Sequence, residues 1–350
     1  MPQLQGVGNG EAAAELRGGV MDQAMVWVLL HFLLAAVATW LARCYALRLQ
    51  LLDPPGERRS HAVPTPRGGG VGIVVAVLLG VVWLWLQWPP QRVLLGCVAA
   101  GLLLVAGIGF VDDHRSLSPW SRLAVQVVAS ALLAWGFHQA TGLAGTAVVG
   151  FVLAMVLVNI WNFMDGIDGL AASQAAIVAT GLALAMASGP LAWLAAGLAA
   201  AVLGFLPFNF PRARIFLGDV GSGALGYLLA ALLTAAYAWS GLYWPLLLLP
   251  LAAFGVDAAF TLLTRMLTGQ RWWTPHVSHA YQAWAKRAGN HVPATLAYAT
   301  FTGVGVILML AGISWRPWTV LGAGVLWYLL AILLWARLRK DVPMGKETQP

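Results

Sequence analysis

Charged side chains are scarce in this sequence. Asp, Glu, Lys and Arg together make up 9% of its 350 residues, whereas 60% are hydrophobic. Because soluble domains carry about 25% charged residues, this composition excludes an ordinary soluble globular protein. Cysteine is scarce too: the sequence has only Cys44 and Cys97. Two cysteines provide neither a disulfide framework nor a cysteine metal site. We interpret both as small apolar packing residues.

Long hydrophobic runs are what the sequence has instead. Apolar runs of roughly 18 residues or more are typical of membrane-spanning helices. Eleven spans are predicted, at residues 25–45, 70–88, 93–111, 121–138, 146–163, 170–188, 190–207, 223–240, 244–264, 293–312 and 318–336. The predicted fold is an all-α integral membrane protein, a polytopic bundle of about 11 transmembrane helices.

Composition divides the chain into three parts. Residues 1–24 form a polar tail rich in Gly and Ala, with Met21 and Met25 as alternative starts. Residues 25–336 form one polytopic domain, and residues 337–350 form a basic tail. No cleavable signal peptide is recognised, because the first apolar run has the length of a span and no clear cleavage site follows it.

Basic residues are distributed unequally between the two sides of the membrane. Eleven spans place seventeen of the 20 Lys and Arg residues on the side of the 46–69 loop, and only Arg17, Arg92 and Arg316 on the other side. Cytoplasmic loops carry the excess of Lys and Arg, so the C-terminus is predicted to be cytoplasmic and the N-terminus periplasmic. The net charge of +7 then reflects topology and anionic lipid. Without a separate basic domain, it does not indicate nucleic acid binding.

Carboxylates gather at the predicted cytoplasmic ends of the spans. Five of the 13 acidic residues lie at such ends, namely Asp112, Asp113, Asp165, Asp168 and Asp219. A transporter more often places ionisable groups near the middle of the membrane and breaks helices there. The pattern therefore favours an enzyme with its active site at the cytoplasmic face. Asp257 lies inside a span, should find a donor in the bundle interior, and is interpreted as structural.

One span closes with two amides and two carboxylates. Asn159, Asn162 and Asp165 recur every three residues and share a helix face approximately. Asp165 and Asp168 then project near each other, and oxygen ligands of this kind suit Mg²⁺ or Mn²⁺. Helix capping is the alternative, but it explains one of these four residues rather than all of them.

Two further acidic motifs stand at span ends. Asp112 and Asp113 repel each other, so a cation, an Arg or a proton must neutralise them; a solvated pair in a loop is the alternative. Arg212 and Arg214 precede a Gly-Asp-x-Gly-Ser-Gly motif in which Asp219 stands at a helix start. Free backbone N–H groups there would suit phosphate oxygens, and Asp219 could hold a cation that bridges those phosphates.

Two loops complete the polar set. His276 and His279 are three residues apart and could share a helix face. A zinc site is short of ligands, so contact with phosphate or sugar is favoured. The first loop is stiffened by Pro and Gly, contains Arg67 and ends in the triple Gly of residues 68–70. These glycines permit the backbone to approach a ligand or a neighbouring helix.

Five motifs follow one another between about residue 50 and residue 285. They are Asp53-x-Pro with Pro64-Thr-Pro-Arg67-Gly-Gly, Gly-Phe-x-Asp112-Asp113, Asn159-x-x-Asn162-Phe-Met-Asp165-Gly-x-Asp168-Gly-Leu, Phe-Leu-Gly-Asp219-x-Gly-Ser-Gly and His276-x-Ser-His279. In this order they resemble the polyprenyl-phosphate N-acetylhexosamine-1-phosphate transferases, the MraY/WecA-like group of glycosyltransferase family 4. The resemblance implies a bacterial inner-membrane enzyme that needs Mg²⁺ or Mn²⁺. Its substrates would be a UDP-N-acetylhexosamine and undecaprenyl phosphate, and its products UMP and an undecaprenyl-diphosphate sugar.

The resemblance also implies roles for individual residues. Asp219 matches the family's metal-binding Asp, with Asp165 beside it. Asp112 and Asp113 match its catalytic Asp pair. The residues that would bind substrate are Asn159, Asn162, Asp165, Asp168, Arg212, Arg214, His276, His279 and Arg67. Two mechanisms stay open: direct attack by the lipid phosphate, or an aspartyl intermediate on Asp112.

Two departures from the family pattern bear on the donor sugar. The muramoyl-pentapeptide branch has consecutive His residues in the last loop and a Lys after its Asp pair. This chain has two separated His residues, and Arg115 or Ser116 in the place of the Lys. The resemblance is therefore closer to members that initiate O-antigen, in lipopolysaccharide biosynthesis. The rival class is a transporter or flippase of an anionic lipid-linked or phosphorylated sugar, for which Asp257 and His31 would be the midplane polar residues. Membrane lipid is an expected partner, and a homodimer is left open.

Overall fold

The computed structural model describes residues 7–53, 64–186, 188–270 and 277–340, and helices dominate them. In chain order the elements are α1 (Val7–Arg48), β1 (Leu52–Asp53), β2 (Thr65–Pro66), α2 (Val71–Gln87), η1 (Pro89–Gln91), α3 (Arg92–His114), α4 (Pro119–Thr141), α5 (Ala144–Phe163), α6 (Leu170–Met186), α7 (Pro190–Asn209), α8 (Gly218–Trp239), α9 (Trp244–Leu248), η2 (Leu249–Leu251), α10 (Ala252–Leu267), α11 (Ala280–Ala288), α12 (Val292–Ala311), η3 (Gly312–Ser314) and α13 (Pro317–Arg339). The two strands pair antiparallel, with Leu52 opposite Pro66.

The prediction of an all-α polytopic membrane protein is confirmed. Within the described residues, nine helical stretches are long and apolar enough to cross a membrane. The other two predicted spans are α2 and α6, which have 17 residues each. At 1.5 Å per residue such a helix is about 26 Å long, a little less than the hydrocarbon core of about 30 Å.

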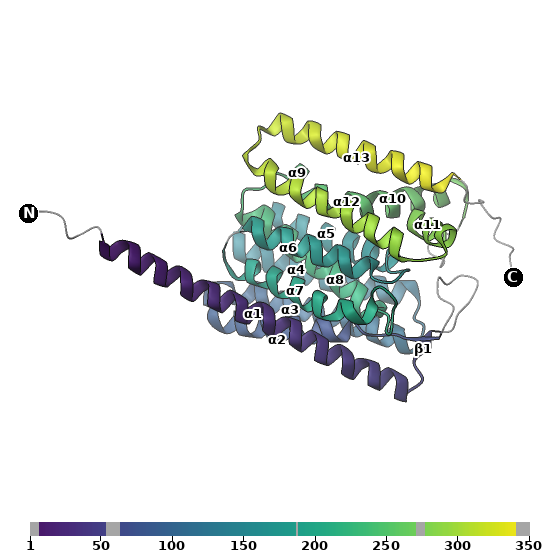
Figure 1. The fold of residues 1–350 in the computed structure, drawn as a ribbon, viewed down its shortest axis with the longest axis horizontal. Helices are drawn as coiled ribbons and strands as arrows, with labels where there is room; N and C mark the ends of the chain where they lie inside the picture. The colour runs from purple at the N-terminus through teal and green to yellow at the C-terminus, as the bar shows by residue number, and fades with distance from the viewer. Residues whose placement is uncertain (1–6, 54–63, 187, 271–276, 341–350) are drawn as a thin grey trace, which may run out of the picture.

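The ends of the chain differ from the prediction in extent. Helix α1 begins at Val7, so the predicted polar tail is helical from that residue onward. In Figure 1 the first part of α1 extends beyond the rest of the bundle. The predicted span 244–264 is built from α9, η2 and α10, where Pro250 lacks the N–H that a continuous α-helix would use.

Helix α8 forms the centre of the bundle. Its most apolar 18-residue window is 94% buried, against 11% for α13. Small residues let its neighbours approach: a Cβ on Gly226 of α8 would lie 2.3 Å from the carbonyl oxygen of Leu157 on α5. On the other side, Gly101 of α3 receives the ring of Tyr227, whose hydroxyl donates to the Cys97 carbonyl. Helix α8 is therefore fixed on several sides.

The long helices run in alternating directions between the two ends of the bundle, with α9, η2 and α10 together forming one such stretch (Figure 1). Helix α1, with α2 and α7, forms one edge, and α13, with α10 and α12, forms the opposite edge. The end that we call the site end holds the last residues of α1, α3 and α5, which are Arg48, His114 and Phe163, and the first residue of α8, Gly218. β1 and α11 lie at this same end in Figure 1.

The loop before α2 packs directly on the start of α8. The Gly69 and Gly70 N–H groups donate to the carbonyls of Phe216 and Leu217, at 2.9 and 2.8 Å. A Cβ on Gly70 would lie 2.2 Å from the Cα of Gly221, so no larger residue fits. The glycines before α2 thus allow two backbones to approach closely, which is one of the two roles predicted for them from the sequence.

Candidate active site

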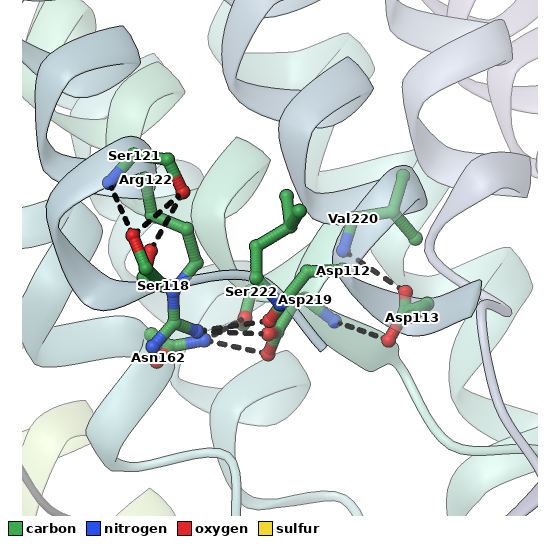
Figure 2. A network of polar contacts seen from close by, with 10 residues as sticks. Asp112, Asp113, Ser118, Ser121, Arg122, Asn162, Asp219, Val220 and Ser222 are labelled. Atoms are coloured by element: carbon green, nitrogen blue, oxygen red, sulfur yellow. Dashed lines mark hydrogen bonds and ion pairs between the residues drawn. The ribbon is translucent and has the colours of Figure 1, made fainter. Parts of the chain in front are cut away.

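Asp219 lies at the centre of a polar network at the site end (Figure 2). It stands in the first turn of α8, directly after Gly218, whose φ of +77° is in the left-handed region. Asn162 Nδ2 on α5 donates to its Oδ1 at 2.7 Å, and Arg122 Nη1 on α4 lies 3.2 Å from its Oδ2. Three helices thus converge on one carboxylate, whose side chain is still 32% exposed.

Asp112, near the end of α3, shares Arg122 with Asp219. Arg122 Nη1 lies 3.0 Å from Asp112 Oδ2, and the Leu117 N–H donates to Asp112 Oδ1 at 2.5 Å. The carboxyl groups of Asp112 and Asp219 are also close enough to interact directly. Ser118 caps α4 by accepting a backbone N–H of its first turn, which orients the helix that carries Arg122. One guanidinium therefore contacts two carboxylates, and its single positive charge balances one of them.

Asp113 is directed to a different partner from its neighbour Asp112. It accepts the backbone N–H groups of Asp219 and Val220, at 3.1 and 3.2 Å, and is 5% exposed (Figure 2). A carboxylate at a helix N-terminus is stabilised by the helix dipole. Asp113 thereby caps α8 from α3. Two of the N–H groups that the glycine-rich motif predicted as phosphate ligands are therefore already bound.

Asp165 lies in the turn that follows α5. Burial, and then the negative charges of Asp219, Asp113 and Asp168, raise the pKa of the Asp165 carboxyl well above its usual range. The carboxyl group therefore keeps its proton to a higher pH than a free Asp, unless a cation takes the place of that proton.

Asp168 supports the loop between α7 and α8. Its Oδ2 accepts the Ala213 N–H at 3.1 Å, and His291 Nδ1 lies 3.3 Å from its Oδ1. The same His291 nitrogen is 3.3 Å from the Asp168 backbone nitrogen, so the tautomer of the imidazole decides which contact forms. Arg212 and Arg214, on either side of Ala213, are exposed. Asp168 thus acts on the position of these two arginines.

Asn159 and Arg67 lie at the margin of the network. Asn159 Nδ2 donates to Gln126 Oε1 at 2.9 Å and so ties α5 to α4. The charge of Arg67 acts on both Asp112 and Asp113. Arg67 Nε is buried and has no hydrogen-bond partner among the described residues. Arg67 thus contributes positive charge to the acidic pair.

The last predicted motif anchors α11 at the site end. His279 is 2% exposed, and its Nδ1 lies 3.3 Å from Asp257 Oδ1. Two backbone N–H groups at the start of α11 donate to Asp257 at 2.9 and 3.1 Å, which confirms that this buried carboxylate finds donors. Tyr281 on α11 donates to the Phe163 carbonyl at 3.1 Å, beside the Asp165 turn. His279 is therefore buried in the anchor of α11, and His276 lies outside the described residues.

Sequence reasoning assigns no role to Arg122, Asn209 or His291. Asn209 is buried, accepts the Gly169 N–H at 2.9 Å and donates to the Ile215 carbonyl at 3.0 Å. The available signal for Arg122 was a charge inside the predicted span 121–138, which is costly in a membrane without a partner. Nothing local marks His291, which lies 123 residues after Asp168.

The donor atoms at the site end are of the kind that hard cations prefer. Carboxylate and amide oxygens suit Mg²⁺ and Mn²⁺. In the part of the chain that the structure describes, however, no three His, Cys, Asp or Glu side chains form a ready metal site. Instead, the Arg122 guanidinium bonds to two of the carboxylates, Asp112 and Asp219.

Known proteins are similar to this chain in sequence. Residues 94–237 match the family model described as Glycosyl transferase family 4. A decaprenyl-phosphate N-acetylglucosaminephosphotransferase of Mycobacterium tuberculosis is 36% identical over 266 residues, which are 65% of this chain and 64% of that relative. A Bacillus subtilis protein named "Probable undecaprenyl-phosphate N-acetylglucosaminyl 1-phosphate transferase" is 27% identical over 289 residues, 75% of this chain and 78% of the relative.

A second branch of relatives also matches. A phospho-N-acetylmuramoyl-pentapeptide-transferase of Synechocystis is 34% identical over 222 residues, 56% of this chain and 59% of the relative. The match to the mycobacterial protein spans slightly less than two thirds of that relative's length. The membrane fold, the acidic motifs at one end of the bundle and these matches agree. Residues 94–237 of this chain therefore match glycosyl transferase family 4, and the chain is similar to the polyprenyl-phosphate hexosamine-1-phosphate transferases.

Proposed function

We propose that this protein transfers an N-acetylhexosamine 1-phosphate from a UDP-sugar to undecaprenyl phosphate, releasing UMP. The observation that carries this proposal is the convergence of Asp112, Arg122, Asn162 and Asp219 from four helices at one end of a membrane bundle. A site at the end of the bundle is open to a water-soluble nucleotide and also to a lipid phosphate in the membrane. The names of the relatives describe transfer to polyprenyl phosphates.

The reaction joins two anions, so neutralising charge is the main requirement. An oxygen of the lipid phosphate attacks the sugar-linked phosphorus of the donor. The bond from this phosphorus to the oxygen of UMP breaks, and UMP leaves with that oxygen. Mg²⁺ or Mn²⁺, held by Asp219 with Asp165 nearby, would supply charge neutralisation. The exposed Arg212 and Arg214 are suited to bind phosphate oxygens of the donor.

Direct attack is favoured over an aspartyl intermediate. Both oxygens of Asp112 already accept hydrogen bonds, one from the Leu117 N–H and one from Arg122. These bonds stabilise the carboxylate and make it a poorer nucleophile. The attack is then left to the lipid phosphate.

We propose UDP-N-acetylglucosamine as the first donor to test and O-antigen initiation as the pathway. The mycobacterial and Bacillus relatives are named for this sugar, and the last loop of this chain lacks consecutive His residues. The excess of Lys and Arg at the site end supports a site that faces the cytoplasm, where UDP-sugars are found.

The test is UMP release by the detergent-purified protein. It uses undecaprenyl phosphate, Mg²⁺ and a panel of UDP-N-acetyl sugars, with chelator as the control. Cation-dependent release with one sugar supports the proposal and identifies the donor, whereas no release with any sugar rejects it. Transport of a lipid-linked sugar into vesicles without UMP release would favour the rival transporter. An Asp112→Asn variant with near-normal turnover would remove Asp112 from both mechanisms.

A further inference from the structure

Arg122 bonds to two carboxylates through one nitrogen. Its Nη1 lies 3.0 Å from Asp112 Oδ2 and 3.2 Å from Asp219 Oδ2. Both carboxylates are held by other donors as well, Asp112 by the Leu117 N–H and Asp219 by Asn162. The carboxylates are therefore fixed from several sides, whereas the described contacts of the guanidinium are with these two side chains (Figure 2).

The two carboxylates need a counter-charge, because like charges this close disfavour each other's ionisation. Arg122 supplies that charge, and it lies where a divalent cation that binds both carboxylates would lie. The side chains of Arg122 and Asp219 are 31% and 32% exposed, and that of Asp112 is 10% exposed. The ion pair between the two partly exposed groups, Arg122 and Asp219, is therefore the weaker one. The long, partly exposed side chain of Arg122 can therefore be displaced, whereas the Asp113 carboxylate is buried under the start of α8 and stays fixed.

We infer that Arg122 is an internal counter-cation that a divalent cation displaces, and that the displaced guanidinium then pairs with a phosphate group of a substrate. The inference rests on the proposed function for the identities of the cation and the phosphate. It accounts for the guanidinium that now bonds to two carboxylates of the type that hard cations prefer. The site is completed when the guanidinium leaves the two carboxylates.

The exchange couples two binding events. Without a cation, the two carboxylates occupy Arg122 and compete with an incoming phosphate. With the cation in place, the guanidinium is released and the phosphate binds more tightly. Because such coupling is reciprocal, the phosphate must raise the affinity for the cation by the same factor.

Arg115 provides a matched control for this inference. It lies in the connection that leads from α3 to α4, a short way before Arg122 in the sequence, carries the same charge and is exposed. No hydrogen bond to Asp112 or Asp219 links it to the network of Figure 2. An Arg115→Gln variant therefore removes an equal charge nearby and leaves the bridge intact.

The test measures Mn²⁺ affinity of the full-length protein in detergent, from the electron paramagnetic resonance signal of free Mn²⁺. Arg122→Gln is expected to bind Mn²⁺ at least about fivefold more tightly than wild type, the lower end of typical coupling between sites. Farnesyl phosphate serves as a short prenyl phosphate. It should tighten Mn²⁺ binding in wild type, and the gain in Arg122→Gln should be smaller by about the same factor of five. Arg115→Gln should match wild type in both measurements.

Several outcomes would overturn the exchange. Equal or weaker Mn²⁺ binding by Arg122→Gln is one, and an equal gain in Arg115→Gln is another. Arg122→Lys keeps the positive charge, so its Mn²⁺ affinity should stay near that of wild type. A gain in Mn²⁺ affinity as large as that of Arg122→Gln would also contradict the inference. Gel filtration verifies folding, and Mn²⁺ should restore any loss of thermal stability in Arg122→Gln.

The exchange and the proposed function can fail separately. An intact exchange in a protein that releases no UMP from any UDP-sugar rejects the proposed function alone. UMP release by the wild type, with unchanged Mn²⁺ affinity in Arg122→Gln, rejects the exchange alone. Absence of Mn²⁺ binding by both proteins would reject the exchange together with the proposed cation.

Discussion

Replacing Asp113 by Asn separates a structural role of this carboxylate from a chemical one. Asp113 accepts two backbone N–H groups at the start of α8, from Asp219 and Val220, and is 5% exposed. Asn keeps one acceptor oxygen, but its NH₂ group faces the second N–H. Hydrogen bonds to charged groups are worth about 1.5–3 kcal/mol each, so we expect a loss of about 2 kcal/mol for Asn and about 4 kcal/mol for Ala.

The assay combines three measurements on Asp113→Asn in detergent: the denaturation midpoint, the Mn²⁺ affinity and the rate of UMP release. Because Asp113 holds the first turn of α8, the position of the Asp219 carboxylate should loosen when it is replaced. All three quantities should therefore fall together. Asp112→Asn is the comparison, since Asp112 pairs with a partly exposed Arg122 and should lose less stability.

One result would refute this reasoning about Asp113. If Asp113→Asn kept the stability and the Mn²⁺ affinity of the wild type but lost UMP release, capping would not be its function. Asp113 would then take part in the chemistry directly, as the family resemblance of the Asp pair implies.

Three further predictions concern other contacts of the site end. Gly109→Ala should lower the free energy of unfolding by about 1–3 kcal/mol and reduce activity, because the added Cβ would lie 2.4 Å from the Asp219 carbonyl oxygen. Gly107→Ala on the same helix is the control, since a Cβ there meets nothing within 4 Å and should change neither stability nor activity. Asp257→Asn should increase hydrogen exchange of α11 at its first residues, since two of their N–H groups donate to this carboxylate; unchanged exchange would contradict the anchor. The raised pKa of Asp165 means that a cation must displace a proton there, so Mn²⁺ affinity should keep rising as the pH is raised above the usual range of an Asp carboxyl. Asp165→Asn should flatten this rise, and an unchanged slope would exclude Asp165 as its source.

That the acidic motifs lie at one end of the bundle was predictable from the sequence, but the hydrogen bonds among them were not. Hydrophobic runs predicted which helix ends lie together, and the charges at those ends included Asp112, Asp113, Asp165 and Asp219. The same motifs suggested free N–H groups at the start of α8, two of which Asp113 occupies. The motifs also predicted that His279 contacts the substrate. In the structure the His279 side chain is buried against Asp257.

The sequence by itself determined the membrane class, the helical fold and the side on which the polar motifs gather. These follow from the local cost of exposing polar groups to lipid, which each stretch of about 20 residues carries on its own. The tertiary structure decided how the polar groups pair. Arg122 meets Asp219 across 97 positions, and Asp113 meets the start of α8 across 106. Such pairings depend on which helices pack around α8, and no local pattern in the sequence encodes that choice.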